Sequence, residues 1–174
     1  MKTTHKFIHS NSTEIENIGP VSLILTSPPY PMIEMWDEAF SKQNPKIKDA
    51  LDNKDGVAAW LLMTEIVNKV LTVSCENLLP GGFLVVNIGD ATRSINSEFA
   101  LYGTSSLIDV HCVNTLNLTK LPKIIWSKPS NKATKYMGSG MLPSGAYVSH
   151  EHEDILIYRK GGKQKFNEKQ ARTG

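Results

Sequence analysis

Two nearly continuous apolar runs stand out along the chain. Residues 21–26 are Val-Ser-Leu-Ile-Leu-Thr, and residues 83–90 are Phe-Leu-Val-Val-Asn-Ile-Gly-Asp. Short apolar runs with β-branched members are typical of strands buried in a parallel sheet. The first run ends just before Pro28-Pro29, and proline cannot extend a strand ladder because it has no N–H donor. We therefore expect two buried parallel strands, the first of them followed by a rigid loop.

A helical period links the two runs. Between residues 55 and 79, one face of a helix would carry Trp60, Met63, Val67, Val70, Leu71, Ser74 and Leu78. Pro80-Gly81-Gly82 is expected to end this helix. The order strand, helix, strand implies a right-handed parallel crossover, and this predicts an α/β fold.

The remaining pattern predicts one more helix and two more strands. We expect the helix at 105–114 and the strands at 123–127 and 154–159. The intervening Gly/Ser/Lys-rich loop, 128–150, is long enough to be functional or mobile rather than a simple connection. The tail from 161 to 174 is polar, which is typical of a linker or frayed end. The sequence thus predicts one domain over 1–160 and a tail over 161–174.

Composition excludes several classes of protein. A chain of 174 residues with 40% hydrophobic residues can bury a core. It has no apolar run of roughly eighteen residues and no signal-like stretch near its start, so we expect a cytoplasmic protein without membrane contact. Cys75 and Cys112 lack CxxC spacing, so we expect them to be reduced, with Cys75 in the core. His150 and His152 have no third ligand nearby, and no metal is expected.

Charge is distributed unevenly. Residues 1–119 hold 8 Lys/Arg against 13 Asp/Glu, whereas residues 120–174 hold 11 against 4. A basic segment of this kind is expected of a surface that binds a polyanion such as nucleic acid. The alternative is a set of ordinary solvated lysines.

The segment Ser27-Pro28-Pro29-Tyr30 follows the first predicted strand, at the end of a sheet where ligands bind in open α/β folds. The two prolines remove amide donors, so the loop offers carbonyl oxygens. A planar base could stack on the Tyr30 ring while its exocyclic amine donates to the Ser27 hydroxyl and the Pro28 carbonyl. The alternative is a turn or polyproline-like stretch without chemical function.

Four segments in order resemble the β-type DNA amino-methyltransferases of restriction–modification systems. Residues 27–30 are similar to their catalytic [Ser/Asn/Asp]-Pro-Pro-Tyr motif, and residues 78–90 to the segment that follows it. Ile124-Ile-Trp-Ser-Lys-Pro129 resembles their Ile-Ile-Trp-x-Lys-Pro motif, and residues 149–160 resemble their His-Glu-containing strand. Serine in the first position is commonest among the N4-cytosine enzymes. The resemblance therefore favours methylation of cytosine N4, with adenine N6 as the alternative.

The resemblance also implies a fold and a set of binding residues. The fold would be a partial Rossmann-like methyltransferase sheet, a catalytic wing of mixed parallel and antiparallel strands with flanking helices. Ser27, Pro28, Pro29 and Tyr30 would be catalytic and would hold a base flipped out of duplex DNA. The cofactor would be S-adenosylmethionine, with Thr26, Ser27 and Asp90 as contacts, although Asp90 could instead cap the following helix. The DNA contacts would be Trp126, Lys128, Lys132 and Lys135; the alternative is a core aromatic residue and solvated lysines.

One family motif is not found. The family binds its cofactor through an Asp-Pro-Phe-x-Gly-x-Gly-like loop, and Gly138-Ser-Gly140 follows no predicted strand and precedes no predicted helix. We therefore expect a truncated or split enzyme that needs a cofactor-binding half. Its unpaired apolar sheet edge would bind a complementary chain or a second copy. The rival hypotheses are a non-catalytic DNA- or partner-binding remnant, and a methyltransferase acting on RNA or on a protein amide.

Overall fold

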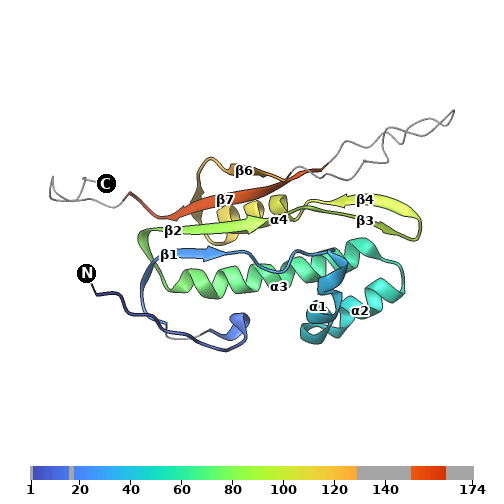
Figure 1. The fold of residues 1–174 in the computed structure, drawn as a ribbon, viewed down its shortest axis with the longest axis horizontal. Coiled ribbons are helices and arrows are strands. Elements are labelled where there is room, and N and C mark those ends of the chain that lie inside the picture. The colour runs from blue at the N-terminus through green and yellow to red at the C-terminus, as the bar shows by residue number, and fades with distance from the viewer. Residues whose placement is uncertain (1, 16–17, 129–149, 164–174) are drawn as a thin grey trace.

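The computed structural model describes residues 2–15, 18–128 and 150–163. Its main sheet has the order β1-β2-β7-β5, and β6 also pairs with β7. The strands are β1 (Val21–Thr26), β2 (Leu78–Ile88), β5 (Leu118–Lys120), β6 (Ile124–Ser127) and β7 (His152–Lys160). β1 and β2 are parallel, whereas β7 runs antiparallel to β2, β5 and β6 (Figure 1). The predicted mixed sheet is confirmed.

Several helices connect β1 to β2. They are η2 (Glu34–Trp36), α1 (Asp37–Gln43), α2 (Pro45–Asp52) and α3 (Gly56–Glu76). α3 begins where the Asp55 carboxylate accepts a hydrogen bond from the Ala58 N–H at 2.9 Å, which satisfies one free donor of its first turn. The predicted helix is confirmed, but its predicted end is wrong. α3 ends at Glu76, and Pro80-Gly81-Gly82 lies inside β2, where the pairing with β1 shifts register.

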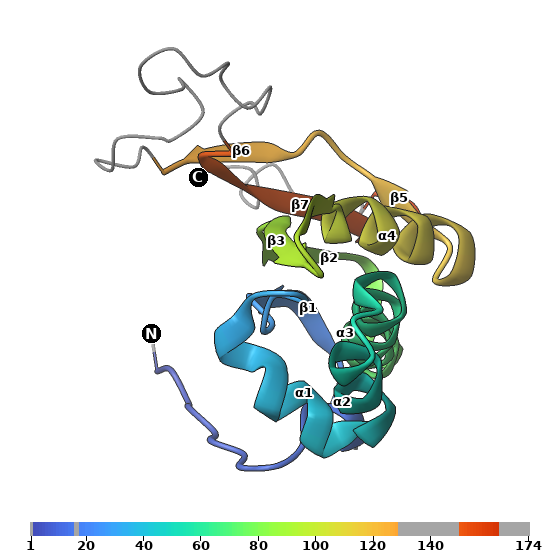
Figure 2. The ribbon, with the colours of Figure 1, turned by 90° about the vertical axis from the view of Figure 1, so that its right-hand side faces the viewer.

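The core lies between the sheet and helices α3 and α4 (Thr104–Val110), which cover the same face (Figure 2). α4 continues into a turn of π-helix, η3 (His111–Thr115), and a short η1 (Ser12–Glu14) precedes β1. The fully buried sheet residues on the covered face are Leu84, Val86, Ile88, Leu156 and Tyr158.

The other face of the sheet is not covered by any described helix. Leu23 and Leu25 of β1 are 56% and 71% exposed, and Phe83, which pairs with Leu23, is 40% exposed. β1 pairs only with β2 among the described strands. The prediction that β1 is buried is therefore wrong, because one face and one edge of this strand lie open.

Helix α3 is, by length and composition, the one described helix that could cross a membrane. This is weak evidence, because the same test is passed by helices that pack inside a soluble core. Met63, Val67 and Leu71 of α3 are buried in the core of this domain. Cys75 and Cys112 are free and buried, and burial raises the pKa of their thiols to about 11 and about 12, respectively.

A hairpin of β3 (Ala91–Ile95) and β4 (Glu98–Tyr102) directly follows the second predicted strand and was not expected from the sequence. Its turn residues Asn96 and Ser97 both have positive φ, at 53° and 66°, as a type I′ hairpin turn requires. Arg93 donates to both carboxylate oxygens of Asp37, at 2.8 and 2.7 Å, which fixes the hairpin to α1.

Candidate active site

The Ser27-Pro28-Pro29-Tyr30 loop lies at the carboxyl end of β1, as the sequence predicted. It is anchored by the two residues that follow, because Pro31 and Met32 are both buried. Met32 has a left-handed φ of 67°, and its N–H donates to the Met63 Sδ at 3.3 Å. A non-glycine residue in this conformation costs about 1 kcal/mol or more, so the surrounding packing must hold it. The loop is therefore attached rigidly to the core.

The Tyr30 hydroxyl is the centre of a polar cluster. It donates to the Glu153 Oε2 at 2.9 Å, and it lies 3.3 Å from the Ser27 Oγ. The Asn87 amide Nδ2 donates to the Tyr30 oxygen and to Glu153 Oε2, at 2.7 Å in both cases. Side chains from the β1 loop, β2 and β7 thus meet at one end of the open sheet face.

The sequence assigned no catalytic role to Asn87 or Glu153, although Glu153 lies in the His-Glu-containing segment 149–160 that resembled the family. One signal was available: Asn87 is the polar member of an otherwise apolar strand. A second signal lies in the pairing, because Asn87 is opposite Ile155, and Glu153 is two residues from Ile155 on the same face of β7. That register could not be read before the pairing of β2 with β7 was known.

Gly89 makes room for the tyrosine ring. A Cβ at Gly89 would lie 3.0 Å from the Tyr30 Cε2 and 3.4 Å from the Glu153 Cγ. Any side chain there would force the ring to shift by a few tenths of an ångström. Tyr30 is thus held by its packing at Gly89 as well as by its hydrogen bonds.

The electrostatics keep Glu153 ionised and Tyr30 neutral. Burial disfavours the Glu153 carboxylate, but hydrogen bonds from Lys128, Asn87 and Tyr30 outweigh it and hold the pKa of Glu153 below its ordinary value. Burial, together with the neighbouring Glu153 carboxylate, raises the pKa of Tyr30. Lys128 forms an ion pair with Glu153 and lies 4.3 Å above the centre of the Trp126 ring.

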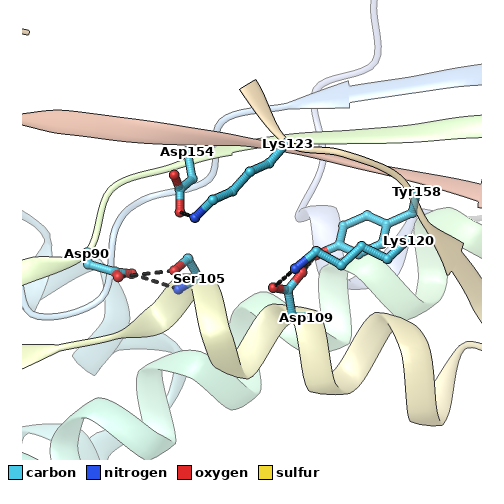
Figure 3. A network of polar contacts seen from close by, with 7 residues as sticks. All are labelled: Asp90, Ser105, Asp109, Lys120, Lys123, Asp154 and Tyr158. Carbon is cyan, nitrogen blue, oxygen red and sulfur yellow. Dashed lines mark hydrogen bonds and ion pairs between the residues drawn. The ribbon is translucent and has the colours of Figure 1, made fainter. Parts of the chain in front are cut away.

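The next residue on β7 points to the opposite face. Asp154 is 5% exposed and pairs with Lys123 at 2.7 Å on the α4 side of the sheet (Figure 3). Its Oδ1 is buried and has no hydrogen-bond partner among the described residues. Adjacent carboxylates therefore serve different parts of the protein, Glu153 in the candidate site and Asp154 in the core.

We expect Lys123→Ala to lower the free energy of unfolding by about 1–2 kcal/mol, because Asp154 would keep a buried charge without its ion-pair partner. Chemical denaturation followed by circular dichroism measures this change. Lys120→Ala is the matched control, since Lys120 pairs with the more exposed Asp109 and should matter less (Figure 3). Equal losses in the two variants would contradict the expected role of the buried carboxylate.

Asp90 acts on a helix. Its two carboxylate oxygens accept from the Ser105 N–H at 2.7 Å and from the Ser105 hydroxyl at 3.0 Å, at the start of α4 (Figure 3). Of the two roles considered for Asp90, the structure shows the capping of a helix. Asp90 could contact a cofactor only through those lone pairs of its carboxylate oxygens that accept no hydrogen bond from Ser105. Thr26 ends β1 and is half-buried.

The predicted DNA contacts are only partly visible. Trp126 is 49% exposed, and Lys128 beside it is exposed but paired with Glu153. Lys132 and Lys135 lie outside the described residues, as do Gly138-Ser-Gly140 and most of the 128–150 loop. In the part of the basic segment that is described, Lys120 and Lys123 are also paired with carboxylates, so these lysines are not simply solvated.

The rings of His150 and His152 are 4.5 Å apart. Across residues 2–15, 18–128 and 150–163, no group of three His, Cys, Asp or Glu side chains could hold a metal ion.

Residues 21–174 match a family model described as DNA methylase, of the N6/N4 type. The chain is 46% identical to the type II methyltransferase M.MthZI of Methanothermobacter thermautotrophicus, over 99% of this chain and 49% of the relative. It is 39% identical to the type II methyltransferase M.MjaI of Methanocaldococcus jannaschii, over 96% of this chain and 59% of the relative. The chain thus spans about half to three-fifths of the length of these curated relatives.

A solved structure shares the fold. TTHA0409 of Thermus thermophilus, a candidate DNA modification methylase crystallised with S-adenosyl-L-methionine, has a TM-score of 0.61 and 24% identity to this chain. The match covers 92% of this chain and 57% of that protein. The four segments that resembled methyltransferase motifs all lie within residues 21–174, which the family model matches.

Proposed function

This chain belongs to the N6/N4 DNA methylase family, and from that we propose that it is the catalytic half of an S-adenosylmethionine-dependent DNA methyltransferase that modifies cytosine N4. The observation that carries the proposal is the position of Ser27-Pro28-Pro29-Tyr30. This loop follows β1 at the carboxyl end of a parallel strand, and its hydroxyl groups converge with Asn87 and Glu153. The domain would comprise residues 1–160, with 161–174 as a tail.

The loop suits an exocyclic amine. We place a flipped-out base against Tyr30, where stacking on the ring contributes about 1–3 kcal/mol. The amine donates one hydrogen to the Ser27 oxygen and the other to the Pro28 carbonyl. Pro28 and Pro29 have no N–H groups that could compete for those acceptors. These bonds fix the orientation of the amine lone pair toward the methyl group.

The described residues supply one side of a cofactor site. Thr26 ends β1, the strand whose outer edge pairs with no described strand, and Ser27 follows it directly. Asp90 is bound to Ser105. Among the described residues, β4, Gly103 and α4 follow one another as strand, glycine and helix, but the Ser105 N–H in the first turn of α4 is already bound to Asp90. When bound, S-adenosylmethionine supplies the methyl group.

Methyl transfer to duplex DNA tests this function. The test protein is the completed enzyme, by which we mean this chain fused to or mixed with the part of M.MthZI that the chain does not match. Labelled S-adenosylmethionine is the donor, and the DNA is digested to nucleosides and analysed by mass spectrometry. N4-methylcytosine is the expected product. N6-methyladenine would show instead that adenine N6 is the target. Label only in RNA or protein, or no S-adenosylmethionine binding by calorimetry, would overturn it.

DNA binding by the completed enzyme should weaken steeply with salt, because bound phosphates release counterions. The log–log slope should be about −0.9 for each phosphate that is neutralised. We expect Lys128→Ala to reduce the magnitude of this slope by about 1. Lys46→Ala on α2 is the control, since this exposed lysine lies away from the candidate site. Binding that does not depend on salt, or equal slopes in the unmodified enzyme, Lys128→Ala and Lys46→Ala, would show that Lys128 does not contact DNA phosphates.

A further inference from the structure

We propose that Glu153 positions Tyr30 and receives, through the Tyr30 hydroxyl, the proton that Ser27 takes from the target amine. This inference rests on the proposed function. An amine that attacks a methyl group through its lone pair becomes positively charged and must then lose a proton. The Ser27 oxygen is the acceptor placed at that amine, but a neutral hydroxyl cannot keep an added proton. The Glu153 carboxylate, which the Tyr30 hydroxyl connects to Ser27, can accept that proton.

The hydrogen bonds fix the direction of the relay. Tyr30 has one hydroxyl hydrogen, and it is donated to Glu153 Oε2 at 2.9 Å. The Tyr30 oxygen therefore acts only as an acceptor in its other two contacts. Asn87 donates to it at 2.7 Å, and Ser27, 3.3 Å away, must be the donor in the remaining contact. The Asn87 Nδ2 also donates to the Ser27 Oγ, at 3.5 Å, and the second lone pair of that oxygen remains to accept the hydrogen of the amine.

The proton transfer balances along this chain. The amine nitrogen forms a bond to the methyl carbon of the sulfonium donor, while the methyl–sulfur bond breaks and its electron pair goes to sulfur, leaving a neutral thioether. One N–H bond then breaks with its electron pair remaining on nitrogen. That proton moves to Ser27 Oγ as the original serine proton moves to Tyr30 Oη. The tyrosine proton then moves to Glu153, which becomes a neutral carboxylic acid. Solvent later removes the proton from Glu153 and restores the starting state.

Each group that faces Glu153 supports its role as an acceptor. Lys128 comes from the end of β6 and pairs with the carboxylate, while the Asn87 amide comes from β2. Tyr30 is the other titratable group in direct contact with Glu153. Asp154, the next residue on β7, pairs with Lys123 on the opposite face of the sheet. The carboxylate is therefore surrounded by donors and remains ionised, as an acceptor must be.

Kinetics of the completed enzyme test the relay. Glu153→Gln should lower kcat by about 10²-fold, within the range of general base catalysis, and leave KM for DNA nearly unchanged. Tyr30→Phe should lower kcat to a similar extent, and the double variant should be no worse than the single ones, because both changes break the same relay. Glu153→Asp should recover part of the loss. Glu151→Gln removes a nearby charge outside the cluster and should leave kcat unchanged.

The pH dependence has a defined sign. Glu153 must be ionised, so kcat should fall as pH drops through its pKa, which lies below the ordinary value. Lys128→Met removes a donor that lowers this pKa, so the fall in kcat should move to higher pH. In the 174-residue chain, carbon NMR of the Glu153 carboxyl should show the same upward shift without any need for turnover. A carboxyl that is protonated at pH 7 would overturn the relay.

The outcomes separate this inference from the proposed function. Full kcat in Glu153→Gln, combined with loss of methylation in Ser27→Ala, would overturn the relay and leave the methyltransferase assignment standing. Absence of DNA methylation by the unmodified completed enzyme would overturn the proposed function instead. Thermal melts of every variant identify any loss of kcat that follows from unfolding. If a variant unfolds, the NMR titration of the Glu153 carboxyl in the 174-residue chain tests the relay instead.

Discussion

Tyr30→Ala should lower kcat of the completed enzyme by about 10³-fold or more, because the change removes both a stacking surface and a proton path. The ring contributes about 1–3 kcal/mol through stacking, and the hydroxyl links Ser27 to Glu153. Because the side chain is only half-buried, we expect the melting temperature to fall by a few degrees at most. Single-turnover methylation of duplex DNA and a thermal melt measure the two effects.

Comparison with Tyr30→Phe divides the loss between ring and hydroxyl. The sequence assigned a role only to the Tyr30 ring, and a ring that acts by stacking alone predicts that Tyr30→Phe retains substantial activity. The hydrogen bonds of the Tyr30 hydroxyl change that expectation, so Tyr30→Phe should lie between wild type and Tyr30→Ala. A Tyr30→Ala protein that melts far below wild type, and regains activity with stabilising additives, would make Tyr30 a structural residue instead.

The 174-residue chain by itself should transfer no methyl groups, and addition of the part of M.MthZI that the chain does not match should produce transfer. The physical reason is the open sheet, since β1 pairs only with β2 among the described strands and exposes Leu23 and Leu25. An unpaired apolar edge is a template for pairing with another strand. We therefore expect the isolated chain to bind a complementary polypeptide or a second copy of itself. Sedimentation and a methylation assay, each with and without the added part, measure both effects.

A substitution at the open face locates this contact. Leu25→Lys should block association and restored activity, because it places a charge on the surface that would be covered. Leu101→Lys is the matched control, since Leu101 is also more than half exposed but belongs to the β3–β4 hairpin. A stable monomer that methylates DNA unaided would show that the cofactor site lies within this chain, and the Gly138–Gly145 loop would then be its first candidate.

The sequence predicted those elements whose pattern is local. The apolar run of β1, the period of α3 and the strand at 154–159 were identified because hydrophobic spacing alone specifies them. The β3–β4 hairpin was missed, since Asn96-Ser97 is a weaker hairpin signal than Asn-Gly or Asp-Gly. The end of α3 was placed too late, because Pro80-Gly81-Gly82 fits a helix stop and an irregular strand start equally well.

The candidate site was predictable only in part. Ser27 and Tyr30 could be found because they belong to a compact motif at a strand end. Asn87 and Glu153 could not be assigned a role, because their contact with Tyr30 depends on strand pairing between residues 66 positions apart. Long-range register follows from packing of the whole sheet, and a local pattern does not specify it.

The placement of Glu153 and Asp154 on opposite faces of β7 limits how this protein can change in length. A one-residue insertion or deletion within the strand would exchange their directions, sending the lysine-paired core carboxylate to the loop after β1 and burying the other beneath α4. Both errors would arise together from a single event, so lineages that gain or lose residues in β7 should lose folding and chemistry at once. Insertions that lie outside the paired residues 152–160 leave this alternation intact. Natural length variation among relatives should therefore avoid this strand, even where substitutions within it are frequent.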